Sequence, residues 1–184
     1  MLKKDIKIIK SMLNPEKDRI SKAFFEGGFY YVCDGYRMVR WDSSTLDLLG
    51  EMIAGKEASI PLFDESENHC NIMPELQVVA NIDDWQEVKI PYTLKQIKEW
   101  YKYMRDDLGR LAFNIGMPIE LKGFTSMEIN FRFLIDALET TKNFTLKVST
   151  KGRRILVEGN GFTWIIMPIA GKHEPVMTEI GVMV

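Results

Sequence analysis

Hydrophobic residues repeat at helical spacing near the start of the chain. Between residues 2 and 13 an apolar side chain recurs every three or four positions, which is the spacing of one face of an α-helix. This face comprises Leu2, Ile6, Ile9, Met12 and Leu13. Asn14-Pro15 predicts the end of the helix, because proline disfavours helical geometry in the residue before it.

Three short runs rich in aromatic and β-branched residues follow this helix. Gly27-Gly28 and Asp34-Gly35 separate them, and both pairs are typical of tight turns. The runs are RISKAFFEGG, FYYVCDG and YRMVRWD, at residues 19–28, 29–35 and 36–42. They predict a meander of three antiparallel strands.

The same order of elements recurs near the C-terminus. Asn130 is a suitable cap for a helix whose buried face carries Phe131, Leu134, Ile135 and Leu138. The runs FTLKVS, RRILVEG and FTWIIMPI follow, separated by TKG and NG. We therefore predict an α+β fold with pseudo-twofold halves, each a helix plus a three-strand meander, with the helices packed on one face of antiparallel sheets.

A further helix is expected between these two parts, over residues 94–108. Thr93 is a suitable N-cap and Gly109 a suitable end, and EVKIPY at residues 87–92 predicts a strand before it. The basic residues of this helix fall on one narrow arc beside its apolar face, and those of the first helix fall opposite its apolar face. Both helices therefore carry a stripe of positive charge.

The composition is that of an ordinary globular protein, with 46% hydrophobic and 27% charged residues in a chain of 184. No apolar run approaches the roughly 20 residues that a membrane span requires, so we expect a cytoplasmic protein with no membrane contact. The net charge of −2 is unevenly distributed: residues 1–41 sum to +4, residues 42–94 to −9 and residues 95–184 to +3. A local surface that attracts phosphate is compatible with this distribution.

Sequence motifs for catalysis are absent. The chain has no Gly-rich phosphate loop, no His-Glu-x-x-His and no Gly-x-Ser-x-Gly, and only His69 and His173 are available for a catalytic triad. His69 lies beside Cys70, but two adjacent ligands cannot close a tetrahedral metal site. The acidic pairs Asp83-Asp84 and Asp106-Asp107 are more typical of solvated charge than of a Mg²⁺ site. We expect no enzyme activity, no cofactor and no metal.

The C-terminal segment resembles the beta subunit of bacterial DNA polymerase III, the ring-shaped sliding clamp. Residues 127–169 are similar to the end of that protein: Asn130 stands at a helix start, LIDAL occupies residues 134–138, and Met167-Pro168 ends the last strand. More loosely, IDDWQEVKIP at residues 82–91 is similar to the stretch that links the second and third clamp domains. Together these motifs imply a DNA-clamp-like fold.

The turn CDGYRM is similar to the Asp-Gly-x-Arg turn of the same family. Gly35 would supply the turn geometry, Asp34 would accept hydrogen bonds from nearby backbone N–H groups, and Arg37 would pair with an acidic neighbour. We expect these three residues to have a structural role.

The resemblance also bears on domain organisation. We expect a single clamp-like unit over residues 1–184, with halves at about 1–41 and 110–169 and an acidic insertion at about 42–92. The alternative is a split near residue 81 into two shrunken clamp domains. Because a clamp subunit has three domains and is about twice as long, a ring would need more copies of this chain than the family's dimer, and we expect a homo-oligomer.

In clamps, helices line the central hole and touch the phosphates of duplex DNA without reading sequence. The resemblance therefore implies a replication accessory protein, from a mobile element or phage, that contacts duplex DNA non-specifically. The DNA-binding candidates are Lys3, Lys7, Lys10, Lys95, Lys98, Lys102 and Arg105. The alternative for these residues is ordinary solvation of exposed helix faces. The alternative function is a protein-interaction module, not a ring, that binds replication-protein peptides or a host clamp.

Overall fold

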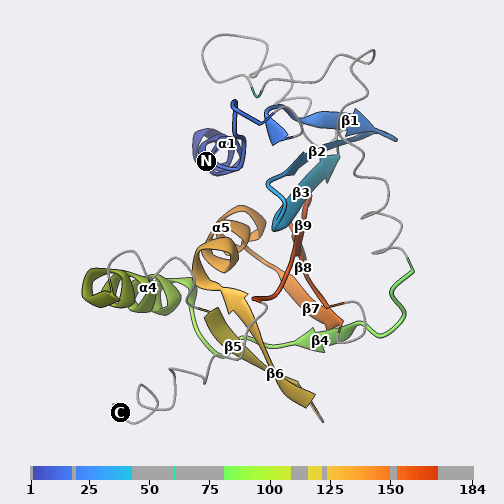
Figure 1. Cartoon of the computed structure of the whole chain (residues 1–184). Coiled ribbons are helices and arrows are strands. Elements are labelled where there is room, and N and C mark those ends of the chain that lie inside the picture. Colours follow the sequence, from blue (N-terminus) through green and yellow to red (C-terminus); the bar gives the residue numbers. More distant parts are fainter. Residues whose placement is uncertain are drawn as a thin grey trace.

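The computed structural model describes residues 2–17, 20–42, 60, 81–108, 116–121, 124–149 and 153–169. Within these ranges the chain forms a seven-stranded antiparallel sheet, a separate two-stranded antiparallel sheet and three α-helices. Figure 1 shows the helices on one side of the large sheet. In the same ranges, no helix is both long and apolar enough to cross a membrane.

The N-terminal half consists of one helix and three sequential strands. These are α1 (Leu2–Lys10), β1 (Phe24–Glu26), β2 (Phe29–Cys33) and β3 (Arg37–Asp42), and β2 pairs with both neighbours. Helix α1 ends at Lys10, earlier than the apolar pattern up to Leu13 suggests. After it, the N–H of Met12 donates to the carbonyl of Ile9 and the N–H of Leu13 donates to the carbonyl of Lys10. These three-residue bonds tighten the chain ahead of Pro15.

The C-terminal half has the same order of elements. It comprises α5 (Phe131–Thr141), β7 (Thr145–Ser149), β8 (Arg154–Gly159) and β9 (Phe162–Ile166). Asn130 caps α5 as expected, since its side-chain oxygen accepts a hydrogen bond from the backbone N–H of Arg132 at 3.0 Å.

The two halves meet at the middle of the large sheet. Strand β3 pairs antiparallel with β9, with Val39 opposite Trp164, and the strand order is β1-β2-β3-β9-β8-β7-β4. The two three-strand meanders therefore join through their last strands, and each helix packs on the same side. This arrangement confirms the predicted α+β fold with pseudo-twofold halves.

The segment between the halves contributes one edge of the sheet, a helix and a hairpin. Strand β4 (Gln86–Val88) pairs with β7, and α4 (Leu94–Leu108) packs against α5. Strands β5 (Gly116–Leu121) and β6 (Phe124–Asn130) form the small sheet that leads into α5. Thr93 caps α4 in a reciprocal pair: its N–H donates to Gln96 Oε1 at 2.9 Å, and its Oγ1 accepts from the Gln96 N–H at 3.3 Å.

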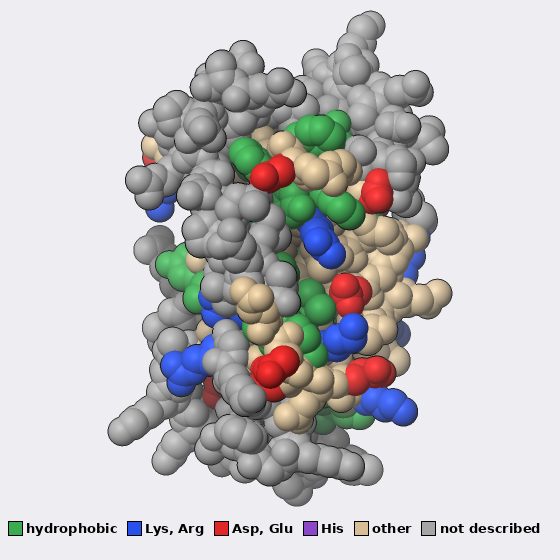
Figure 2. All heavy atoms as spheres, turned by 90° about the vertical axis from the view of Figure 1, so that its right-hand side faces the viewer, with side chains coloured by type: hydrophobic (Ala, Val, Ile, Leu, Met, Phe, Trp, Pro, Cys, Tyr) green, Lys and Arg blue, Asp and Glu red, His purple; other side chains and the backbone are tan. Residues whose placement is uncertain are grey.

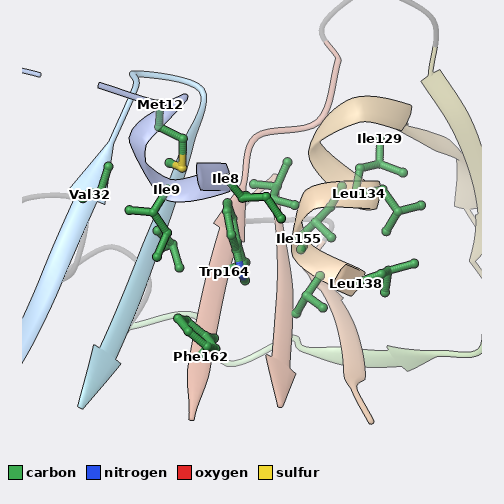
Figure 3. Packing of buried hydrophobic residues seen from close by; sticks show 14 of the residues in the cluster. Ile8, Ile9, Met12, Val32, Ile129, Leu134, Leu138, Ile155, Phe162 and Trp164 are labelled. Atoms are coloured by element: carbon green, nitrogen blue, oxygen red, sulfur yellow. The ribbon is translucent and has the colours of Figure 1, made fainter. Parts of the chain in front are cut away.

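The core lies between the large sheet and the helices. Ile8, Ile9 and Met12 from the α1 segment and Leu134 and Leu138 from α5 belong with strand residues such as Ile155 and Trp164 to one cluster of buried residues (Figure 3). A second cluster of buried residues lies on the other face of the sheet and comprises Tyr31, Met38, Leu156 and Ile165. Successive side chains along these strands thus point to opposite faces of the sheet, as in any β-strand.

Several sequence expectations fall on residues that the structure does not describe. Gly109, His69, Cys70 and His173 lie outside the described residues, and so does most of the acidic segment 42–92. The division into domains therefore stays a prediction.

Candidate nucleic-acid interface

Helix α5 lies between α1 and α4 on the helix side of the sheet (Figure 1). It contacts β8 and β9 beneath it and both neighbouring helices. Ile6 and Ile9 of α1 and Ile97 and Met104 of α4 are buried. The three helices, called the helix layer below, therefore bury apolar faces and leave their polar sides directed outward.

One carboxylate connects all three helices. Glu139 of α5 binds Lys4 of α1, with 2.9 Å between Nζ and Oε1, and the same oxygen binds Nζ of Lys98 from α4. The side chain of Glu139 is 10% exposed, whereas those of Lys4 and Lys98 are 58% and 41% exposed. One lysine from each flanking helix therefore binds the same carboxylate of α5, and both lysine side chains remain partly exposed to water.

The protonation of Glu139 follows from these contacts. Burial by itself would raise the pKa of this carboxyl, but the hydrogen bonds and charges of Lys98 and Lys4 outweigh burial and hold the pKa below its usual value. Asp5 of α1 is a second, buried carboxylate nearby, and burial raises its pKa although Lys142 and Lys4 oppose the shift. Glu139 is therefore an anion at neutral pH.

The other predicted DNA-binding residues lie along the same two helices. Lys7 and Lys102 are exposed. On α4, Lys95 has Glu99 at 3.9 Å and Arg105 has Asp106 at 3.3 Å, and both basic side chains are exposed. Residues three and four apart share a helix face, so Lys95, Lys102 and Arg105 extend the stripe that contains Lys98.

The remaining two candidates are on α1. Lys10 is half-buried near the end of the helix. Lys3 belongs to the helix, but its side chain is outside the part of the chain that the structure describes. Of the candidates on α1, Lys7 is therefore the one with an exposed side chain, and Lys4, which was not a candidate, is a second exposed lysine of this helix.

The opposite face of the sheet has a different charge pattern. Figure 2 looks at the side away from the helix layer, and acidic and basic side chains are intermixed over its described part. Lys147 of β7 binds Glu158 of β8 across the strands at 3.1 Å, and both side chains are partly exposed. Among the described residues of this face, no row of basic side chains comparable to those of α1 and α4 is present.

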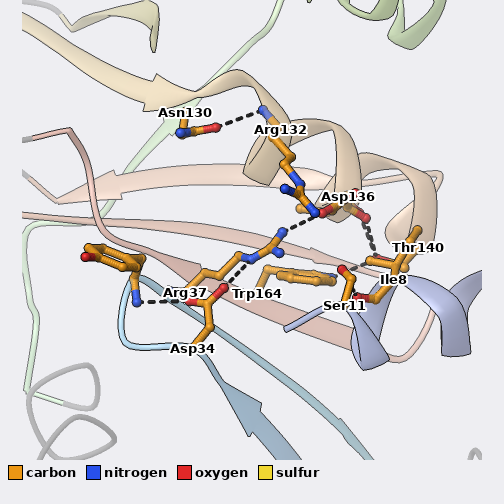
Figure 4. Close-up of polar contacts among 11 residues, drawn as sticks. Ile8, Ser11, Asp34, Arg37, Asn130, Arg132, Asp136, Thr140 and Trp164 are labelled. Atoms are coloured by element: carbon orange, nitrogen blue, oxygen red, sulfur yellow. Dashed lines mark hydrogen bonds and ion pairs between the residues drawn. The ribbon is translucent and has the colours of Figure 1, made fainter. Parts of the chain in front are cut away.

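The Asp-Gly turn connects β2 to β3 and holds Arg37 (Figure 4). Asp34 Oδ1 accepts hydrogen bonds from the N–H groups of Tyr36 and Arg37, both at 3.0 Å, and Gly35 has a φ of +90°, a conformation that other residues rarely adopt. The guanidinium of Arg37 binds Asp34 Oδ2 through Nε at 2.9 Å. Asp34 therefore holds both the backbone N–H and the guanidinium of Arg37.

Arg37 also links the two halves of the fold. Its Nη1 donates to Asp136 Oδ2 of α5 at 2.5 Å, and its guanidinium lies 4.4 Å from the centre of the Phe133 ring. The Arg37 side chain is 2% exposed. Burial raises the pKa of Asp136 above its ordinary value, and the hydrogen bond and charge of Arg37 only partly oppose this. The arginine is thus a buried structural contact at the helix–sheet interface.

Comparison with solved structures finds bacterial beta clamps. The Helicobacter pylori beta clamp bound to a DNA ligase peptide is 12% identical, with a TM-score of 0.57, and the match covers 96% of this chain and 65% of that one. The DNA polymerase III beta subunit of Thermotoga maritima is 14% identical, with a TM-score of 0.52, and the match covers 97% of this chain and 65% of that one. No protein-family model and no curated protein sequence matches the chain.

The chain has a clamp-like fold. It spans about 65% of the length of the clamp subunits that it matches. Within this clamp-like fold, the basic stripes of α1 and α4 belong to the helix layer.

Two residues of the helix layer were not predicted from the sequence to belong to the site. Lys4 and Glu139 form its central contact with Lys98, and neither was a candidate site residue. Glu139 belongs to α5, and only the packing of the three helices brings it to both lysines. Arg132 is exposed on the same helix, seven residues or about two helical turns before Glu139.

Proposed function

We propose that this chain is a clamp-like replication accessory protein that contacts duplex DNA non-specifically through its helix layer. The observation that carries the proposal is the meeting of Lys4 and Lys98, from different helices, on one carboxylate. Their convergence supports a common orientation of the two basic stripes. The likeness of the fold to beta clamps supports the replication role.

A surface of this kind binds phosphate rather than bases. Lysines on flexible stems neutralise phosphates and release counterions, which gives binding that depends steeply on salt and little on sequence. Lys95 and Lys102 are well suited to this role because both are exposed on α4. The chain would act by holding a partner on DNA, and we propose no reaction for it.

Replacing Lys95 and Lys102 together by glutamine is expected to weaken binding to a duplex about tenfold at low salt. Each lost phosphate contact should also make the negative slope of log affinity against log salt shallower by about 0.9. The measurement is fluorescence anisotropy with a labelled duplex over a salt series. Both side chains are exposed, so the variant should keep the stability of the native chain.

A matched control removes two positive charges elsewhere. Lys147 lies on the opposite face of the sheet, and Arg153 is exposed beside the start of β8. The variant with glutamine at both positions has the same net charge as the α4 variant and should bind DNA within about twofold of the native chain. Equal losses in the two variants, or no binding of the native chain even at low salt, would contradict the proposal.

A second candidate function is peptide binding. Tyr36 and Met167 are large apolar side chains with 66% and 41% of their surface exposed. They lie side by side, because the N–H of Met167 donates to the carbonyl of Tyr36 at 2.9 Å. Exposed apolar patches of this kind commonly mark interaction sites. The H. pylori beta clamp was solved with a DNA ligase peptide, and we propose a replication-protein peptide as the partner here.

Replacing Met167 by glutamate tests this second candidate. The change should weaken binding of a DNA ligase peptide about tenfold, because a charge would be placed in an apolar contact, and should leave duplex binding unchanged. Peptide affinity can be measured by calorimetry, and the mass in solution by light scattering. A monomer that binds the peptide but not DNA would favour the interaction module, whereas a closed oligomer that binds DNA would favour the first proposal. Phe25, exposed on β1, provides a control position for the same substitution.

A further inference from the structure

Glu139 lies in the middle of the basic surface proposed for DNA contact. Its carboxylate binds Nζ of Lys4 from α1 and Nζ of Lys98 from α4. Asp5 of α1 and Asp136 of α5 also interact with its charge, and Lys142, the C-cap of α5, interacts with Asp5. A single carboxylate therefore holds the two lysines at which the basic stripes of neighbouring helices meet.

The two lysines retain the means to bind a second anion. Each ammonium group has three N–H donors, and one contact to Glu139 leaves donors available. The exposed fractions of the Lys4 and Lys98 side chains, 58% and 41%, allow a phosphate to approach from outside. Such a phosphate would meet the negative charge of Glu139 at short range, and this repulsion would offset part of the attraction to the lysines.

The contact of Glu139 with its lysines contributes little to folding. Ion pairs with partly exposed lysines typically stabilise a protein only weakly, because water and salt screen them. Helix packing here comes instead from buried apolar residues such as Ile9, Ile97 and Leu134. Removing the charge of Glu139 should therefore leave the fold intact and change mainly the potential of the surface.

We propose that Glu139 is an internal phosphate mimic that restrains DNA binding by the helix layer. It neutralises one of two convergent lysine charges and competes with DNA phosphate for both. The contact with the duplex is consequently weaker than the number of lysines implies, and a weak phosphate contact exchanges rapidly, as movement along a duplex requires. The inference rests on the proposed function, because it concerns the strength of that same DNA contact.

The variant Glu139→Gln tests the inference, because it removes the charge and keeps the shape of the side chain. Its affinity for a duplex is expected to rise about three- to tenfold at low salt. The slope of log affinity against log salt should steepen by up to about 0.9, which corresponds to one more phosphate contact. Adding Lys98→Gln to this variant should abolish most of the gain.

Glu158→Gln is the matched control, because it removes the same charge from an ion pair on the opposite face of the sheet. Glu158 pairs with Lys147 at 3.1 Å. The control should bind DNA within twofold of the native chain, and thermal unfolding should show both variants folded. If the native chain binds DNA and Glu139→Gln binds no more tightly than Glu158→Gln, the restraint is refuted while the proposed function stands. If neither the native chain nor Glu139→Gln binds DNA at low salt, both are refuted.

Discussion

Replacing Arg37 by methionine is expected to lower the free energy of unfolding by about 3–5 kcal/mol, because the change leaves two largely buried carboxylates without their cation. Arg37 binds Asp34 and Asp136, and its own side chain is almost fully buried. The loss should be measured by urea denaturation at pH 7. Since Asp136 belongs to α5 and Arg37 to β3, the variant also removes a direct link between the two halves of the fold.

The cost of this change should depend on pH. Burial already raises the pKa of Asp136 above its ordinary value of 3.8, and removing Arg37 should raise it further. A carboxyl whose pKa is higher in the folded than in the unfolded state costs stability as the pH rises through the window between those two values. The deficit of Arg37→Met should therefore be smallest at the acid end of the range and largest at neutral pH.

Two further variants test whether burial of the ion pair causes the large loss of unfolding free energy. Lys147→Met breaks the partly exposed pair with Glu158 and should cost at most about 1 kcal/mol. Combining Arg37→Met with Asp136→Leu should recover part of the loss, because no buried charge then lacks its cation at that position. A cost for Arg37→Met no larger than that for Lys147→Met would mean that the buried contacts of Arg37 do not stabilise the fold more than a partly exposed ion pair does.

The elements that could be predicted from the sequence are those set by neighbouring residues. Asn130 and Thr93 cap helices at the expected positions, since a cap depends only on the next two or three residues. The strands of both halves follow from alternation of residue types and from Gly-containing turns. The expected strand at residues 87–92 is shorter in the structure, where β4 ends at Val88, ahead of Pro91, which has no N–H to donate.

The contacts that link distant parts of the chain could not be predicted in the same way. Arg37 was expected to pair with an acidic neighbour, and Asp34 is such a neighbour, but Asp136 is 99 residues away. The placement of α4 against α5 is a second example, because an apolar helical stripe indicates that a helix is buried and not what buries it. Such pairings depend on the packing of whole elements.

The candidate site shows the same division. Helical spacing identified the basic stripe of Lys95, Lys98 and Lys102, since a stripe is a property of one helix. The same spacing gave no indication that Lys98 would share a carboxylate with Lys4, because that contact needs three helices in register. The charged residues of α5, Arg132, Asp136 and Glu139, are of both signs and include the glutamate to which both lysines bind.

Replacing Trp164 by alanine is expected to lower the free energy of unfolding by about 3–5 kcal/mol, because it removes a large, fully buried side chain from the joint between the two halves. Trp164 is fully buried on β9 and lies opposite Val39 of β3, the central pair of the sheet. Its Nε1 donates to Thr140 Oγ1 of α5 at 2.7 Å. The variant should be measured by guanidinium denaturation, where a two-state transition at lower denaturant is the expected result.

The variant Trp164→Phe separates packing from hydrogen bonding. Phenylalanine keeps most of the apolar volume and loses only the N–H donor, while Thr140 Oγ1 can still donate to the carbonyl of Ala137 at 2.9 Å. The expected cost is about 1–2 kcal/mol, far below that of alanine. Trp100 is the control: it is half-buried on α4, at an edge contact with Tyr92, and its replacement by alanine should cost less than about 2 kcal/mol. If Trp164→Ala cost no more than Trp100→Ala, the burial of Trp164 would not make the expected contribution to the free energy of unfolding.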